Sequence, residues 1–139
     1  MESVSRQLFL HGSIILFIAL LFGAPYAKAI KRNADAQVVN SWRVAHQALT
    51  IGALVLFAIA PFMNIILVPI GLKWGIALTM IISGYAFAIA TPLAAITKNR
   101  GLEKGAQGLA SLVYLGNIIG AATSLIGAGL LVIAAILSL

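Results

Sequence analysis

Four long stretches without Asp, Glu, Lys or Arg dominate the sequence. They cover Gln7–Ala27, Val44–Leu72, Trp74–Thr97 and Gly105–Leu139, which are 21, 29, 24 and 35 residues long. A membrane-spanning helix needs about 20 apolar residues, so each stretch suffices for one span and none for two spans with a turn. Helices satisfy every backbone group inside lipid, and the stretches lack the alternation of β-barrel strands. We therefore predict an all-α integral membrane protein, a single four-helix transmembrane bundle over residues 1–139.

Proline positions refine the ends of these helices. The predicted spans are about residues 7–30, 42–64, 73–97 and 106–137. Pro61 and Pro69 bracket a short apolar segment, which predicts that the second helix ends near Pro61–Asn64 and that a turn follows. Pro25 and Pro92 lie near helix ends, where we expect kinks or loosened last turns.

Composition narrows the class of protein further. Hydrophobic residues make up 62% of the chain and charged residues 9%, against roughly 45–50% and about 25% in soluble domains. A soluble globule of this size could not bury so much apolar surface, and disorder requires low hydrophobicity. The chain has no cysteine, which excludes disulfides, thiolate metal sites, iron–sulfur clusters and a cysteine nucleophile.

The charged residues predict orientation. Nine Lys and Arg against three acidic residues give a net charge of +6, and the basic residues fall between apolar runs, so we expect no nucleic-acid partner. The first and third loops with their edges carry seven of them: Lys28, Lys31, Arg32, Arg43, Lys98, Arg100 and Lys104. The other side carries only Arg6 and Lys73. The positive-inside rule then places loops 1 and 3 in the cytoplasm, and we expect the inner membrane of a prokaryote.

His46 is the strongest candidate for chemistry. It follows Trp42 by four residues, so both project from one helix face, which Leu49 and Thr50 continue. Imidazole is a common ligand of metals and of haem iron. The alternative is an interfacial histidine that bonds a backbone carbonyl or a lipid headgroup. No acidic or basic side chain lies deep in any span, which argues against a proton pump, an ion-coupled transporter and a voltage sensor.

The remaining polar residues allow two interpretations each. His11 is expected roughly 20 Å from His46 along the membrane normal, too far for both to ligate one haem. Tyr85, with Ser83 beside it, and Asn117 could form the polar wall of a pocket or bond between helices. Gly116 and Gly120 form a GxxxG pattern, which favours close packing of helices or an oligomer.

Several short motifs resemble the styrene oxide isomerase family. They are His11-Gly12 followed by Leu20–Gly23, then Trp42–His46, Gly84-Tyr85 and Asn99–Gly101. The resemblance runs over most of the chain, and the related hydroxylaminobenzene mutases share the four-helix plan and the compact length.

The resemblance implies a specific chemistry. Styrene oxide isomerase is a trimeric membrane enzyme with haem b near its subunit interfaces, and its axial histidine matches His46. Its ferric iron acts as a Lewis acid that opens an epoxide to an aldehyde without net redox, and the mutases move a hydroxyl of an arylhydroxylamine to its ring. Both families act on small lipophilic aromatic substrates. On this interpretation Trp42, Leu49 and Thr50 contact the haem, and a substrate pocket is formed by Tyr85, Ser83, Thr91 and Asn117.

Three catalytic positions differ from the family. The isomerase has an Asn on its second helix and an Asp and a Tyr on its third, and an ungapped reading places Gly52, Ser83 and Thr91 there. Neither the carboxylate nor the phenol is kept. The substrate therefore remains open between an epoxide and an arylhydroxylamine. Two other functions stay open as well: a haem-free assembly or transporter subunit, and a haem carrier or sensor without turnover.

Overall fold

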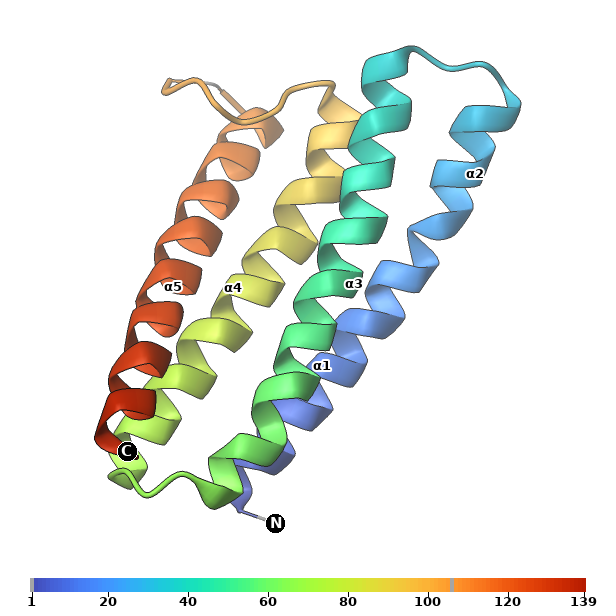
Figure 1. Cartoon of the computed structure of the whole chain (residues 1–139). Helices are drawn as coiled ribbons and strands as arrows, with labels where there is room; N and C mark the ends of the chain where they lie inside the picture. Colours follow the sequence, from blue (N-terminus) through green and yellow to red (C-terminus); the bar gives the residue numbers. More distant parts are fainter. Residues whose placement is uncertain (1, 106) are drawn as a thin grey trace.

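The computed structural model describes residues 2–105 and 107–139, and its regular elements are all helices (Figure 1). They are α1 (Ser3–Leu21), α2 (Gly23–Lys31), α3 (Ala36–Ile65), α4 (Ile70–Thr97) and α5 (Leu109–Leu137). The run Ser3–Lys31 and the helices α3, α4 and α5 are each long and apolar enough to cross a membrane. The predicted all-α bundle with four membrane spans is confirmed, and the chain is an integral membrane protein by the length and composition of its helices.

Three helices begin earlier than predicted. Helix α1 starts at Ser3 instead of residue 7, α3 at Ala36 instead of residue 42, and α4 at Ile70 instead of residue 73. Hydropathy marks only the part of a helix that crosses lipid, whereas α3 continues through polar residues beyond it. Asp35 and Pro69 hold the N-cap positions of α3 and α4 with extended backbones. The expected start of the last helix, residue 106, lies outside the described residues, and α5 begins at Leu109.

The first span is broken near its end, as its proline predicts. Phe22 separates α1 from α2, and Pro25 follows three residues later. Proline has no N–H, and its ring clashes with the carbonyl four residues before it, which weakens the regular helix at this point. The break falls on the Leu20–Gly23 motif. Pro61 and Pro92, in contrast, lie inside α3 and α4, which end at Ile65 and Thr97.

Helix α4 lies in the centre of the bundle (Figure 1). It packs against α1, α3 and α5, and α5 packs against α4 alone. The buried core lies mainly where α1, α3 and α4 meet, and its largest buried side chains include Leu8, Ile15, Leu49, Met63 and Ile76. The helices α3 and α5 flank α4 and do not pack on each other. The groove that α3, α4 and α5 border is therefore open on one side.

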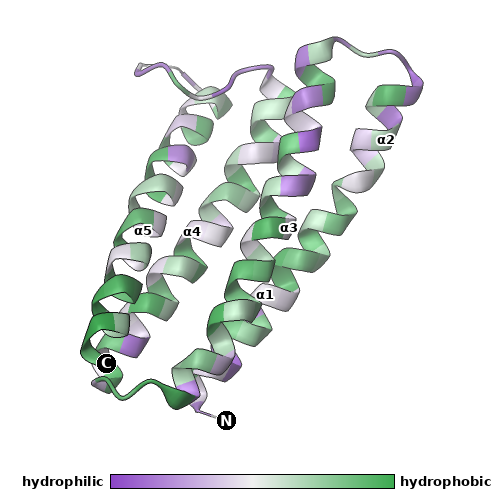
Figure 2. Ribbon diagram, viewed as in Figure 1, coloured by the Kyte–Doolittle hydropathy of each residue, from purple (hydrophilic) through white to green (hydrophobic). Residues whose placement is uncertain are grey.

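The two ends of the bundle differ in polarity (Figure 2). The α2–α3 and α4–α5 loops, which carry most of the basic residues, lie at the same end (Figure 1). Lys98 joins them: its Nζ is 2.9 Å from an Asp35 carboxylate oxygen, and its carbonyl accepts a bond of 2.7 Å from Gln37 Nε2. The predicted grouping of loops 1 and 3 is therefore present in the fold.

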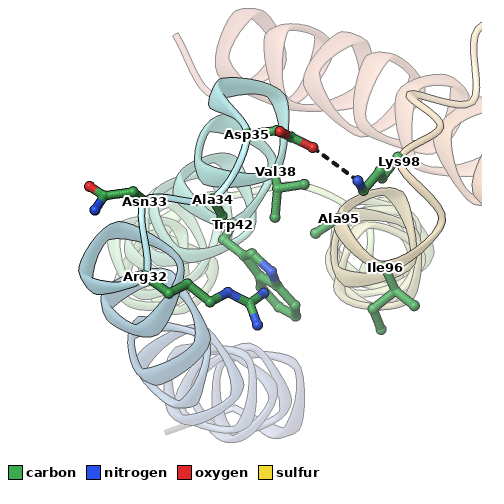
Figure 3. A pocket seen from close by; sticks show the side chains of 9 residues that line it. All are labelled: Arg32, Asn33, Ala34, Asp35, Val38, Trp42, Ala95, Ile96 and Lys98. Atoms are coloured by element: carbon green, nitrogen blue, oxygen red, sulfur yellow. Dashed lines mark hydrogen bonds and ion pairs between the residues drawn. The ribbon is translucent and has the colours of Figure 1, made fainter.

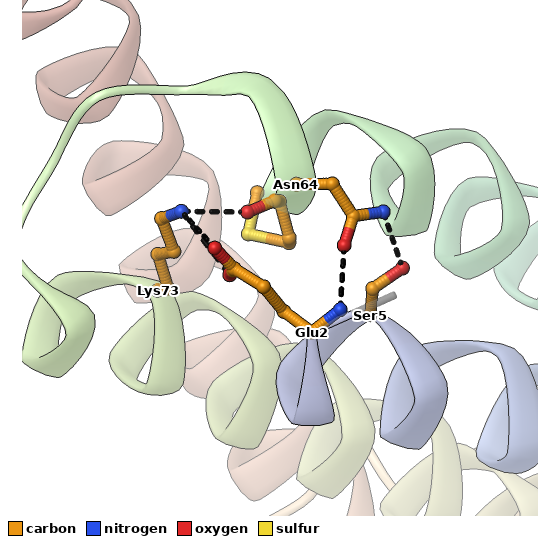
Figure 4. A network of polar contacts seen from close by, with 5 residues as sticks. Glu2, Ser5, Asn64 and Lys73 are labelled. Atoms are coloured by element: carbon orange, nitrogen blue, oxygen red, sulfur yellow. Dashed lines mark hydrogen bonds and ion pairs between the residues drawn. The ribbon is translucent and has the colours of Figure 1, made fainter.

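A polar network closes the opposite end (Figure 4). The Nζ of Lys73 is 3.0 and 3.1 Å from the two carboxylate oxygens of Glu2, and it donates to the carbonyl of Met63 at 2.7 Å. Asn64 accepts a bond from the Glu2 N–H and donates one to Ser5. The sequence places Lys73 on the less basic side of the membrane, and in the fold its side chain is only 7% exposed and is paired with Glu2.

Candidate functional site

The break between α1 and α2 holds the His46 ring. His46 Nδ1 lies 2.9 Å from the carbonyl oxygen of Ala19, in the last turn of α1. A carbonyl can only accept, so Nδ1 is the protonated nitrogen and Nε2 carries the free lone pair. The ring of Tyr26 stacks on the imidazole at 6.3 Å between centroids with an angle of 29°. The helix break thus fixes both the tautomer and the plane of the ring.

The second nitrogen of His46 has no partner among the described residues. No hydrogen bond reaches Nε2, and no fully buried side-chain nitrogen or oxygen lacks a partner, so Nε2 of this half-buried residue is not fully enclosed. A histidine with one nitrogen donating to a carbonyl and the other free is the usual arrangement of a metal-ligating imidazole. The bond to a backbone carbonyl, one of the two interpretations of His46, is therefore present at Nδ1, and metal ligation at Nε2 stays a prediction.

Two residues expected to contact a haem lie close to His46 but have other partners. Thr50 donates its hydroxyl to the carbonyl of His46 at 2.7 Å. Trp42 packs on Phe22 at 5.9 Å between ring centroids. It also lines a cavity of about 380 Å³ at the basic end, with Arg32 and Lys98 among its neighbours (Figure 3).

A largely apolar cavity of about 400 Å³ lies between α3, α4 and α5. The α3 side chains that line it recur at Val44, Ala48, Gly52 and Val55, which share one face of that helix. Gly52, Ser83 and Thr91, the three positions that correspond to the catalytic residues of the resembled family, all line this one cavity, together with Leu49 and Asn117. The fold thus brings together the positions that the sequence could only align.

Hydrogen bonds fix the polar groups of this cavity. Ser83 donates to the carbonyl of Gly120 at 2.8 Å, which joins α4 to α5, and Thr91 donates to the carbonyl of Phe87 at 2.8 Å. Ser124 also lines the cavity and donates to the carbonyl of Ala121 at 2.9 Å. Each hydroxyl is bonded to backbone.

A second cavity continues the first toward the basic end. Its volume is about 310 Å³, and it shares Val44, Thr91 and Asn117 with the apolar cavity. Asn117 Nδ2 donates to the carbonyl of Arg100 at 2.9 Å and so ties the α4–α5 loop to α5 at the junction. Arg100 itself lines this second cavity. The two cavities together form a route from the apolar interior to the loops.

Tyr85 lies elsewhere in the bundle. It is not among the residues that line the apolar cavity, and its hydroxyl is 2.8 Å from His11 Nδ1 with the two rings edge to face. A tyrosine hydroxyl inside the span needs a hydrogen-bond partner, and for Tyr85 this partner is His11. His11 precedes Ala19, which bonds His46, by eight residues, or about 12 Å along α1. The separation of the two histidines along the membrane normal is therefore less than the roughly 20 Å expected, because α3 begins earlier than predicted. Each histidine has its own partner.

The expected haem residues and pocket residues therefore do not form one site within a chain. His46 faces α1 and α2, while the apolar cavity lies on the opposite face of α3, toward α4 and α5. Leu49 lies on the cavity side, and Tyr85 lies on neither. Residues two positions apart on a helix point about 200° apart, so His46 and Ala48 face opposite ways.

The GxxxG glycines serve packing inside the chain. A Cβ at Gly116 would lie 2.8 Å from the Cβ of Ala90, and one at Gly120 would lie 2.8 Å from the ring of Phe87. Both neighbours belong to α4. Of the two uses expected for this pattern, close packing of helices and an oligomer contact, these glycines perform the first.

No group of three His, Cys, Asp or Glu side chains that could hold a metal ion occurs in residues 2–105 and 107–139.

Comparison with known proteins agrees with these features. The family model described as "Styrene oxide isomerase" matches residues 4–136, which is nearly the whole chain. No curated protein and no solved structure matches the chain. The match begins in the first turn of α1 and ends in the last turn of α5, so it includes all four spans, His46 and the lining of the apolar cavity. The chain belongs to the styrene oxide isomerase family.

Proposed function

We propose that this protein is a haem-b-dependent membrane isomerase or mutase that rearranges a small lipophilic aromatic epoxide or arylhydroxylamine without net redox. Membership of the family supports an isomerase-type activity. The observation that carries the haem assignment is the geometry of His46, whose Nδ1 bonds Ala19 and whose Nε2 has no hydrogen bond and is not fully buried. A single neutral imidazole is sufficient as the protein ligand of haem iron.

The residues around His46 suit this role. The carbonyl of Ala19 holds the imidazole in the tautomer that binds iron, and such a bond also raises the basicity of the ligand nitrogen. Tyr26 covers one face of the ring and limits its rotation. When bound there, ferric haem supplies a Lewis acid that can accept the oxygen or nitrogen of a substrate.

The apolar cavity is the proposed substrate site. Its lining binds an aromatic ring by apolar contact, and the hydroxyls of Ser83 and Thr91 together with Asn117 orient the polar end of the ligand. The cavity is open to one side of the bundle, so a lipophilic molecule can enter it from the bilayer. The helices around it keep bulk water away from the reacting group.

We further propose that the complete site forms between two copies of the chain. His46 and the cavity lie on opposite faces of α3, so one chain cannot place both against the same haem. A neighbouring copy can bring its own cavity face against His46 of the first copy. A closed ring of such head-to-tail contacts gives a cyclic oligomer, and the family resemblance favours a trimer.

The test is an absorption spectrum of the protein purified in mild detergent, with wild type, His46→Ala and His11→Ala compared. We expect a haem Soret band in wild type and in His11→Ala, and its loss or displacement in His46→Ala. His11 is the matched control because it is the other intramembrane histidine and has a different partner, Tyr85. A wild type that stays colourless after haem is added would overturn the proposal.

A haem carrier or sensor without turnover is the second candidate. It is favoured by the lining of the apolar cavity, which contains no carboxylate and no phenol among the described residues. It predicts the same Soret band and the same effect of His46→Ala. Incubation of the haem-loaded protein with styrene oxide and with N-phenylhydroxylamine separates the two candidates, because only the isomerase forms product.

A further inference from the structure

The hydroxyl groups that line the apolar cavity have all used their protons. Ser83, Thr91 and Ser124 donate to backbone carbonyls at 2.8, 2.8 and 2.9 Å. A carbonyl oxygen has no proton to give, so in each pair the hydroxyl must be the donor. Ser83 and Thr91 are also buried, with 6% and 9% of their surface exposed, so no water competes for these bonds.

The cavity is left with hydrogen-bond acceptors. A hydroxyl oxygen that donates its single proton still carries lone pairs that can accept. Asn117 adds a carbonyl oxygen, Oδ1, and retains one amide proton, because its other proton goes to the carbonyl of Arg100. The remaining lining residues are glycine or apolar side chains. The side chains that line the cavity therefore offer a ligand four acceptors, which are three hydroxyl oxygens and one amide oxygen. They offer it one donor, the remaining amide proton of Asn117.

This imbalance distinguishes the two substrate classes. An epoxide oxygen has lone pairs and no proton, so it gains no hydrogen bond from these hydroxyl oxygens, and its polar contact is left to the iron of the proposed haem. An arylhydroxylamine carries an N–H and an O–H, both of which can donate to the hydroxyl oxygens. A polar group that is buried without a partner loses its hydration and gains nothing in return.

We propose that the apolar cavity selects small aromatic ligands whose polar group donates hydrogen bonds, and that it therefore favours arylhydroxylamines over epoxides. This inference rests on the proposed function for its reaction, but the preference itself belongs to the residues of the cavity.

A pair of unreactive probes tests the preference directly. Indole and benzofuran have nearly the same shape, but indole presents an N–H where benzofuran presents an oxygen. We would measure the binding of each to the full chain, purified in detergent with its haem content recorded, by titration calorimetry corrected with protein-free micelles. We expect indole to bind about fivefold more tightly, the value of one ordinary hydrogen bond.

Substitutions at Thr91 locate the effect. Thr91→Val removes the accepting oxygen at nearly constant volume and should reduce the preference for indole, while Thr91→Ser keeps the oxygen and should retain it. Thr97→Val is the matched control: Thr97 makes the same kind of bond, to the carbonyl of Leu93 at 2.7 Å, but does not line the cavity. Ser83→Ala provides a second variant in case Thr91→Val does not fold.

Three results would overturn the inference: benzofuran binding as tightly as indole, an unchanged preference in both Thr91→Val and Ser83→Ala, or no saturable binding of either probe. Failure of the haem proposal is read separately, from the Soret band of the same samples. In His46→Ala the preference for indole should persist, since His46 lies on the opposite face of α3 from the cavity.

Discussion

Polar side chains inside this bundle bond mainly to backbone carbonyls. Thr50, Thr79, Thr91 and Thr97 each donate to the carbonyl four residues earlier, and His46 donates to a carbonyl at a helix break. Lipid offers no hydrogen-bond partner, so a side chain in the span must find one in the protein. A polar residue type in the sequence therefore shows that a bond exists but not which group receives it.

The clearest case of this dependence is Lys73, whose ammonium group is buried in the first turn of α4. Glu2 and the carbonyl of Met63 are its partners. We expect Glu2→Ala to lower the free energy of unfolding by about 1.5–3 kcal/mol, the usual contribution of hydrogen bonds to charged groups. Glu2→Gln, which keeps an accepting oxygen, should cost less.

The measurement is thermal or denaturant unfolding in one detergent, followed by circular dichroism. Ser138→Ala serves as the control, since Ser138 only bonds a carbonyl of its own helix at the end of α5. Equal stability of Glu2→Ala and wild type would mean that water or lipid replaces the carboxylate at Lys73.

At the scale of elements, glycines decide how close α5 lies to α4. Gly116, Gly120 and Gly127 each face α4 at a distance that leaves no room for a Cβ, whereas Gly129 has no neighbour within 4 Å of that position. Helices in membranes associate through such close contact of small residues, because lipid provides no hydrophobic force to join them. Since α5 packs on α4 alone, this contact is what holds α5 in the bundle.

We expect Gly116→Ala to destabilise the fold by about 1–3 kcal/mol, the cost of overpacking. Its new Cβ would lie 2.8 Å from the Cβ of Ala90 and 3.1 Å from the backbone oxygen of Ala86, neither of which can rotate away. Gly129→Ala, on the same helix but with free space, should be neutral or stabilising, because alanine favours helix. Detergent unfolding of the two variants side by side tests this, and equal loss in both would contradict the role of packing.

At the scale of the whole molecule, two features support the proposed assembly of several copies. The groove between α3, α4 and α5 is open on one side, and His46 lies on the face of α3 away from that groove. Large apolar side chains of α3 and α5 remain exposed around the cavity, among them Val44, Ile51 and Val55. In a single copy of the bundle, these side chains would face lipid. In the proposed oligomer, part of this surface would meet the His46 face of the next copy.

Mixed assemblies test the shared site. His46→Ala removes the iron ligand, and Gly52→Phe fills the cavity from a position whose Cβ meets no atom within 4 Å. Each variant alone should be inactive on N-phenylhydroxylamine. Coexpressed in equal amounts they should recover about one quarter of the wild-type activity, since random pairing in a cyclic oligomer restores that share of intact sites.

The two variants purified separately and mixed in detergent without exchange of subunits are the control, and should stay inactive. Coexpressed protein that forms the oligomer yet shows no activity would place the ligand and the cavity of each site within one chain.

Much of the architecture is determined by the order of residues alone. The four spans follow from hydropathy, because about 20 apolar residues are required to cross lipid. Exposing such long apolar stretches to water would be unfavourable. Pro25 predicts a kink or a loosened turn near the end of the first span, where α1 and α2 separate, although Pro92 lies inside the continuous helix α4. The short Trp42–His46 motif pointed to the family that the match over residues 4–136 confirms. These are local properties, and each depends on a short segment.

The relations between segments, in contrast, could be learned only from the tertiary structure. Only the packed helices reveal that His11 partners Tyr85, that the GxxxG glycines face α4, and that Gly52, Ser83 and Thr91 line one cavity. They also place His46 and that cavity on opposite faces of α3. The physical reason is that helix rotation is set by the sum of contacts with neighbouring helices, and an apolar sequence in lipid gives little amphipathic pattern from which to predict it.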